Sequence, residues 1–162
     1  MPRFQLAIAN KAYSSWSLRA WLHLKTSGIP FEEIRLPLDT EEWDARIASL
    51  SPSGRLPALR EGDLLVWDSW AIMDHVQARC PNAVGWPEEP AARATALSVA
   101  AEMHSGFFAL REEMPFNCRR RVPGLAFSAP ALADAERVRE IWRSCRSRFK
   151  GGGPWLFGER YT

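Results

Sequence analysis

Residues 51–70, SPSGRLPALREGDLLVWDSW, carry most of the information about how this chain folds. Leu56 and Pro57 begin a short strand, and X-Pro bonds are the usual place for a cis peptide. A tight turn at residues 61–63, centred on a glycine, and a second strand at 64–67 complete a hairpin. This hairpin then leads directly into an apolar helix.

A polar socket is expected where the hairpin meets that helix. Asp68 and Ser69 stand at the helix N-terminus, where backbone N–H groups without helical partners accept a carboxylate. The Asp68 carboxylate can hold an ammonium group. A cis bond before Pro57 would turn the backbone N–H and C=O of Leu56 outward, free to pair with an extended peptide. The stretch therefore predicts a site for a small zwitterionic ligand. The alternative is a plain hairpin followed by a capped helix.

Upstream of this stretch the chain alternates strands and helices. The alternation of apolar residues predicts a strand at residues 4–9, and a loop follows at 10–13. A helix opens at 14–17 and ends near Gly28, a second strand covers 31–36, and a short helix starts at Thr40. With the hairpin and its helix the order is β-α-β-α-β-β-α. This order predicts an α/β domain with a mixed sheet of about four strands flanked by helices.

Downstream the pattern becomes helical. Residues 81–90 contain three prolines and predict a linker. One long helix is expected from 91 to about 114, closed by Pro115, and another from 132 to about 149. We therefore expect a domain at 1–80, a linker at 81–90 and a partial all-α domain at 91–162.

The two motifs at 51–59 and 68–72 resemble the glutathione-binding half of the cytosolic glutathione transferases, a variant of the thioredoxin fold. The family reads roughly Asn/Ser-Pro-x-Gly-x-Val-Pro-x-Leu, then a hairpin, then Glu/Gln/Asp-Ser-x-x-Ile. Here Leu56 replaces the usual valine and Asp68 the commoner Glu or Gln. The resemblance implies that Leu56 and Pro57 present backbone to the cysteinyl part of glutathione. It also implies that Asp68 and Ser69 hold its γ-glutamyl end and that Arg55 reaches a terminal carboxylate.

Hydroxyl groups cluster at residues 13–19, YSSWSLR, where the first helix begins. A helix N-terminus lowers a thiol pKa, and a serine hydroxyl that donates to a thiolate stabilises it. The run resembles the Ser-Ser-Cys-Ser-x-Arg signature of the zeta class, which includes maleylacetoacetate isomerases. Trp16 replaces the cysteine, which counts against isomerase chemistry. The resemblance implies Ser14 as the first catalytic candidate, then Ser15 and Ser17, with Tyr13 a lesser one. The alternative is an N-cap serine cluster without a catalytic role.

The helical domain is expected to supply part of the pocket for the second substrate. His104 and Phe107 would join Tyr13 and Trp16 as pocket residues. Ordinary core packing is the alternative for the apolar residues of this helix. A metal site is not expected, because the three histidines show no ligand spacing.

Composition and charge argue against several other classes of protein. The net charge of +2 argues against a nucleic-acid partner, and no apolar run approaches the roughly 20 residues of a membrane span. Three cysteines far apart argue against a disulfide framework, so we expect a reducing, cytoplasmic compartment. Eight tryptophans indicate that several line a cleft or an interface.

The resemblance thus implies a glutathione transferase that joins the glutathione thiolate to small apolar electrophiles in detoxification, as a homodimer. Residues 155–162 are similar to the segment before the family's central helix of the second domain, so we expect a truncated member that lacks the last helices. Two alternatives remain open: a non-catalytic binding or regulatory relative, and a glutathione-dependent isomerase or dehalogenase.

Overall fold

The structure, a computed structural model, describes residues 4–149, 151 and 153–162. The chain divides into two compact units, each described here by itself. The first unit comprises Met1–Val84 with Phe116–Arg119, and the second comprises Gly85–Pro115 with Arg120–Thr162.

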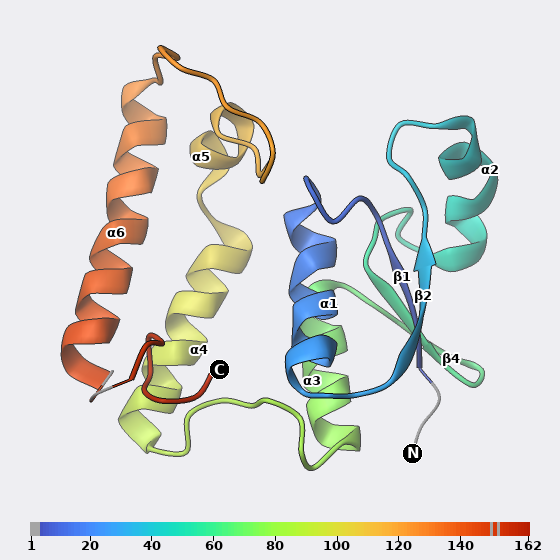
Figure 1. The fold of residues 1–162 in the computed structure, drawn as a ribbon, viewed down its shortest axis with the longest axis horizontal. Helices are drawn as coiled ribbons and strands as arrows, with labels where there is room; N and C mark the ends of the chain where they lie inside the picture. The colour runs from blue at the N-terminus through green and yellow to red at the C-terminus, as the bar shows by residue number, and fades with distance from the viewer. Residues whose placement is uncertain (1–3, 150, 152) are drawn as a thin grey trace. The chain divides into compact units, whose positions relative to one another are not determined.

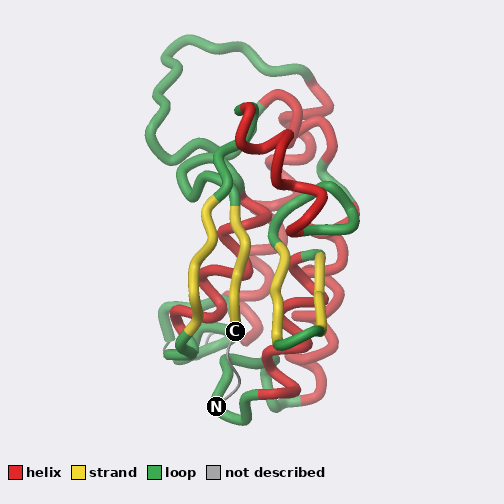
Figure 2. The backbone as a smooth tube through the Cα atoms, turned by 90° about the vertical axis from the view of Figure 1, so that its right-hand side faces the viewer, coloured by secondary structure: helices red, strands yellow, loops and turns green. Residues whose placement is uncertain are grey.

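The first unit is an α/β domain whose element order confirms the β-α-β-α-β-β-α prediction (Figure 1). Its elements are β1 (Phe4–Ile8), α1 (Ser15–Thr26), β2 (Phe31–Arg35), α2 (Glu41–Leu50), β3 (Ala58–Glu61), β4 (Leu64–Trp67) and α3 (Ser69–Arg79). The sheet has the order β2-β1-β3-β4, and Figure 2 shows the four strands side by side. β1 runs parallel to β2 and antiparallel to β3, and β3 and β4 form the antiparallel hairpin. The sheet is therefore mixed, as the sequence predicts.

Two apolar clusters cover the two faces of this sheet. Alternate residues of β1 (Phe4, Leu6 and Ile8) pack with buried residues of α1 and α3, such as Leu24 and Ile72. Ala7 of β1 faces the other side and belongs to a second cluster, which includes Trp43 and Ile47 of α2. Figure 1 shows α1 and α3 on one side of the sheet and α2 on the other. This layering fixes where each helix begins relative to the strand ends.

The second unit is helical, but its first helix is shorter than expected. α4 (Pro90–Ser105) ends at Gly106, and the separate helix α5 (Phe108–Glu113) follows. Phe107 has a left-handed φ of 62°, and it is buried with Ile141 and Cys145. The prediction of one continuous helix over 91–114 is therefore wrong. Burial of the Phe107 ring turns the chain at the position where Gly106 already weakens the helix.

The last helix of this unit, α6 (Ala129–Phe149), starts three residues earlier than predicted. The guanidinium of Arg137 binds the Glu102 carboxylate through two hydrogen bonds of 2.7 and 3.0 Å, which link α6 to α4. Among residues 4–149, 151 and 153–162, no helix is long and apolar enough to cross a membrane. The same residues contain no cluster of histidine, cysteine and acidic side chains that could hold a metal ion.

Candidate functional site

The predicted socket lies at the edge of the sheet where β3 begins and β4 ends. Ala58 pairs with Trp67 in the antiparallel β3–β4 ladder. Leu56 lies two residues before Ala58, and Ser69 lies two residues after Trp67. β1 also ends at this edge, because Ala7 pairs with Ala58. The strand pairing therefore brings the Leu56-Pro57 and Asp68-Ser69 motifs together.

Leu56 keeps its backbone polar groups available at this edge. The Leu56-Pro57 peptide bond is cis, and the Leu56 side chain is buried beside Ala9 and Ala58. Within the described part of the chain, no residue makes a hydrogen bond to the backbone N–H or C=O of Leu56. A buried backbone group normally has a partner. An extended peptide lying along this edge would supply one.

Asp68 and Ser69 form the N-terminus of α3. The Asp68 carboxylate accepts a hydrogen bond of 2.8 Å from the backbone N–H of Trp70 and caps the helix. Asp68 has a φ of 75°, which is uncommon for a residue other than glycine and is often found at functional sites. Ser69 is 1% exposed, and its hydroxyl has no hydrogen-bond partner among the residues that the structure describes. An unpaired buried hydroxyl beside a helix N-terminus suits a carboxylate ligand.

The serine run lies at the same edge, at the N-terminus of α1. Ser14 is the N-cap: its oxygen accepts from the Ser17 N–H at 3.4 Å, and its hydroxyl donates to the Ser17 oxygen at 3.0 Å. The Ser17 oxygen also accepts from the N–H of Ala9 at 3.0 Å. Ser17 has no exposed surface. Ser17 therefore ties the end of β1 to the first turn of α1 through a hydroxyl whose oxygen already accepts two hydrogen bonds within the protein.

The neighbours of Ser14 and Ser17 in the run are more accessible. Ser15 is half-buried, and its hydroxyl makes no hydrogen bond to any residue that the structure describes. The Arg19 guanidinium lies over the Trp16 ring at 4.3 Å, which keeps both side chains close to the helix start. Tyr13 is 43% exposed. Tyr13, Ser14 and Ser15 are thus the residues of the run whose hydroxyl-bearing side chains are not fully buried.

Three hydrogen bonds that hold this loop were not predicted from the sequence. The side-chain oxygen of Asn10 accepts from the N–H of Leu38 at 2.8 Å, and its backbone oxygen accepts from the N–H of Ser14 at 2.8 Å. The N–H of Cys118 donates to the backbone oxygen of Ala12 at 2.9 Å. The Asn10 contact has a local signal, an asparagine directly after a strand. The Cys118 contact has none, because more than a hundred residues separate the partners.

The remaining predicted site residues are distributed over both units. Arg55 is exposed, two positions before Pro57. His104 lies in α4, and Phe107 lies in the core of the second unit, whereas Tyr13 and Trp16 belong to the first. Their assembly into one electrophile pocket stays a prediction.

Residues 13–79 match the sequence profile of a family described as Glutathione S-transferase, N-terminal domain. The matched range contains the serine run, the cis Leu56-Pro57 bond and the Asp68-Ser69 pair. A search of curated protein sequences finds no match to this chain.

Solved structures share the fold over nearly the whole chain. A glutathione transferase homolog from Burkholderia gl BGR1, with bound glutathione, is 19% identical with a TM-score of 0.67, and the match covers 96% of this chain and 75% of the homolog. A homolog from Sulfitobacter, also with bound glutathione, is 21% identical over 100% of this chain and 77% of its own, with a TM-score of 0.64. A theta class glutathione S-transferase from Xanthomonas axonopodis pv. citri, with glutathione bound, is 22% identical with a TM-score of 0.65 and the same coverage. At these identities the likeness shows the fold: a thioredoxin-like domain followed by a helical one.

Proposed function

We propose that this chain, whose residues 13–79 belong to the family of glutathione S-transferase N-terminal domains, binds glutathione at the sheet edge and activates its thiol. Glutathione is an extended peptide with a thiol in its centre and a zwitterionic γ-glutamyl end. The groups at the edge suit each part: a free backbone at Leu56, a helix N-terminus with Asp68 and Ser69, and hydroxyls at Ser14 and Ser15. Arg55 is positioned in sequence to reach the glycyl carboxylate.

The unpaired hydroxyl of Ser69 is the observation that carries this proposal. A buried hydroxyl without a partner costs about 1–3 kcal/mol, and a ligand or an ordered water at the end of the strands would supply the missing bond. Ser69 is 1% exposed and stands two residues after Trp67, which pairs with Ala58 at the start of β3. A γ-glutamyl carboxylate accepting from the Ser69 hydroxyl and the first N–H groups of α3 would satisfy it. The Asp68 carboxylate would then face the ammonium of the same group.

We assign thiol activation to Ser14, and Ser17 supports it through a hydrogen bond. In the structure the Ser14 hydroxyl donates to Ser17. When a thiolate is bound, the pair can reverse: Ser17 donates to the Ser14 oxygen, and the Ser14 hydroxyl points at the sulfur. Ser17 still accepts from Ala9 in this arrangement. Ser14 becomes a better donor because it accepts two hydrogen bonds, from the Ser17 hydroxyl and N–H. Ser15 is the alternative donor.

The reaction would be attack of the thiolate sulfur on an electrophilic carbon of a small apolar molecule. A new carbon–sulfur bond forms while a leaving group departs or, in an addition, while the carbon skeleton takes up a proton. The protein contributes orientation and a stabilised thiolate rather than a covalent intermediate. A role in detoxification, a homodimeric assembly and a cytoplasmic location are the family expectations that accompany this activity.

Isothermal titration with glutathione tests the binding step. Replacing Ser69 by alanine should weaken the affinity by about tenfold or more, because a hydrogen bond to a charged group is worth roughly 1.5–3 kcal/mol. The ligand-free variant should be at least as stable as the wild type, because the hydroxyl it loses has no partner. Ser49→Ala is the matched control, since Ser49 is exposed on α2 and bonds only within its own helix. Equal glutathione affinities for the two variants would overturn the proposed socket.

An ultraviolet difference spectrum of bound glutathione near neutral pH tests the activation step. A thiolate band in the wild type and its loss in Ser14→Ala, with binding retained, would support the assignment. The conjugation rate should then fall about tenfold, equivalent to about 1.4 kcal/mol of lost thiolate stabilisation. Binding without any thiolate band would favour the alternative of a non-catalytic glutathione-binding protein.

A further inference from the structure

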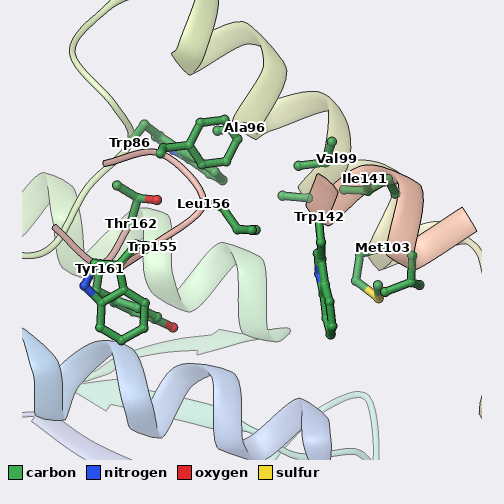
Figure 3. A pocket seen from close by; sticks show the side chains of 13 residues that line it. Trp86, Ala96, Val99, Met103, Ile141, Trp142, Trp155, Leu156, Tyr161 and Thr162 are labelled. Carbon is green, nitrogen blue, oxygen red and sulfur yellow. The ribbon is translucent and has the colours of Figure 1, made fainter. Parts of the chain in front are cut away.

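The connection between α5 and α6 is a long loop that the proposed glutathione chemistry does not use. Residues 114–128 contain no helix or strand, and Figure 1 shows the segment in orange between the two helices. Every residue from 115 to 126 is exposed. None of them lines the cavity of about 410 Å³ that lies between α4, α6 and the terminal segment of the second unit (Figure 3). An ordered loop of this length without secondary structure is uncommon and is often functional.

Hydrogen bonds hold the two ends of this loop together. Glu113, the last residue of α5, accepts from the backbone N–H of Ser128 at 2.8 Å and also from its hydroxyl. The Ser128 oxygen in turn accepts from the N–H of Ala131 at 3.3 Å, in the first turn of α6. Residues 114–127 therefore leave and return at one point, as in the compact Ω-loops that often carry function. The base of the loop is fixed, so its exposed residues are presented by the two helices.

A Pro-Gly turn within the loop carries two exposed apolar side chains. Pro123 and Gly124 form the turn, and the φ of Gly124 is 76°, as at the third position of a type II turn. The residues that flank the turn, Val122 and Leu125, are 43% and 50% exposed. Their burial in an apolar medium would be favourable. Because proline and the turn restrict the backbone, presenting these side chains to a partner costs little conformational entropy.

Positive charge stands directly before this turn. Residues 119–121 are three consecutive arginines, all exposed, and residues 114–133 contain no acidic side chain. The acidic residues on either side of that stretch, Glu113 and Asp134, both accept hydrogen bonds from backbone N–H groups. The loop therefore combines a local excess of positive charge with an apolar turn. This combination complements a surface that is negatively charged outside and apolar just beneath.

We propose that residues 119–125 dock this protein on the surface of an anionic phospholipid bilayer. The arginines would pair with lipid phosphates, because the guanidinium group presents donors that match phosphate oxygens. Val122 and Leu125 would enter the boundary between the headgroups and the acyl chains, where apolar side chains leave water. Nucleic acid offers phosphates as well, but it would leave these two side chains in water. This contact requires no spanning helix and does not depend on glutathione binding.

Co-sedimentation of the unmodified chain with lipid vesicles tests the chemistry of this surface. Phosphatidylcholine vesicles with about 30 mol% phosphatidylglycerol should bind the chain at least about tenfold more tightly than phosphatidylcholine alone, because basic residues are attracted to an anionic surface. Raising the salt concentration from about 0.05 M to about 0.5 M should weaken this binding by about tenfold or more, since salt screens the attraction. Equal binding to the two vesicles, or binding to neither, would refute the proposal.

Removing charge from the loop tests where the vesicles bind. Arg119→Gln combined with Arg121→Gln should weaken binding to the anionic vesicles by about tenfold or more. Neither side chain makes a hydrogen bond or ion pair to the residues that the structure describes, so the fold should be unaffected. Arg35→Gln combined with Arg93→Gln is the matched control, because it removes the same charge from two other exposed arginines. Equal losses in the two double variants would assign the binding to net charge and overturn the proposal.

Removing an apolar side chain from the turn tests the contribution of the lipid interior. Leu125→Ser should weaken binding by about threefold or more, because membrane affinity scales with buried apolar area. Leu64→Ser is the matched control, since Leu64 is 49% exposed on β4 and lies outside the loop. It should leave the affinity within about twofold. A chain that ignores the vesicles but binds a polyglutamate peptide through Arg119 and Arg121 would assign the loop to an acidic protein and overturn the proposal.

Discussion

Replacing Ser17 by alanine removes the hydroxyl that connects the serine run to the sheet. The Ser17 oxygen accepts from the buried N–H of Ala9 at 3.0 Å, and Ser17 has no exposed surface. The variant leaves this N–H without a partner, in a place that water does not reach. An unsatisfied buried donor costs about 1–3 kcal/mol. For a chain of this length each kcal/mol corresponds to roughly 2–4 °C, so the melting temperature should fall by roughly 2–12 °C.

Urea unfolding followed by far-ultraviolet circular dichroism measures the change in unfolding free energy. Amide hydrogen exchange at Ala9 measures the local effect, because the loss of its acceptor should reduce protection there first. Ser15→Ala is the matched control: it is the adjacent residue, and its hydroxyl bonds to no described residue. The control should change the unfolding free energy by less than about 0.5 kcal/mol.

The same substitution has a functional consequence if Ser17 supports Ser14. The thiol pKa of bound glutathione should rise in Ser17→Ala, because Ser14 loses one of the two hydrogen bonds that strengthen it as a donor. A Ser17→Ala protein as stable as Ser15→Ala, with unchanged protection at Ala9, would refute the structural role. If Ser17→Ala loses the expected stability while the thiol pKa of bound glutathione is unchanged, only the proposed support of Ser14 by Ser17 is refuted.

Three further predictions concern pH and backbone geometry. Burial lowers the pKa of His23 below its usual 6.5, so the unfolded state takes up protons first and stability falls as the pH drops below 6.5. In urea titrations at pH 5 and 7.5, His23→Leu should remove this loss of stability. A loss of the same size in the wild type and the variant would contradict the prediction. The hydrogen bond from Arg79 holds the pKa of Glu61 below its usual 4.5, so the stabilisation is present above 4.5 and lost as the pH falls through the lower value. Glu61→Gln should therefore show a flatter stability curve below pH 4.5, and a curve parallel to that of the wild type would argue against it. Gly153→Ala would place a Cβ atom 2.0 Å from the Gly158 oxygen, so it should displace residues 155–158 and lower the unfolding free energy in urea. An unchanged unfolding free energy would contradict this prediction.

Much of the first unit follows from local sequence signals. The glycine turn after Glu61 and the helix caps Ser14 and Asp68 act on their immediate neighbours, and the structure has the predicted elements there. The cis bond before Pro57 is also as the sequence suggests. Turn and cap chemistry depends on residues within four positions of each other, which is why a single sequence reveals it. The order of these elements then restricts the sheet to few topologies.

The helix break in the second unit depended on packing. Gly106 lowers helix propensity, but a single glycine is compatible with a continuous helix. The break occurs because Phe107 is buried against Ile141 and Cys145, residues of a helix that begins more than twenty positions later. The left-handed φ of Phe107 costs energy that this burial offsets. No pattern in the surrounding sequence reports on that contact.

The site shows the same division between local and distant information. The sequence alone determined which residue types stand at the starts of α1 and α3, and hence that a carboxylate and a thiolate suit those positions. Tertiary structure decided that Ser17 is committed to Ala9, that the Ser69 hydroxyl is left without a partner, and that Cys118 holds the loop at Ala12. It also built the cavity of the second unit from residues as far apart in the sequence as Trp86 and Thr162. Local conformation is set by neighbours along the chain, whereas burial and pairing are set by residues that meet only once the chain has folded.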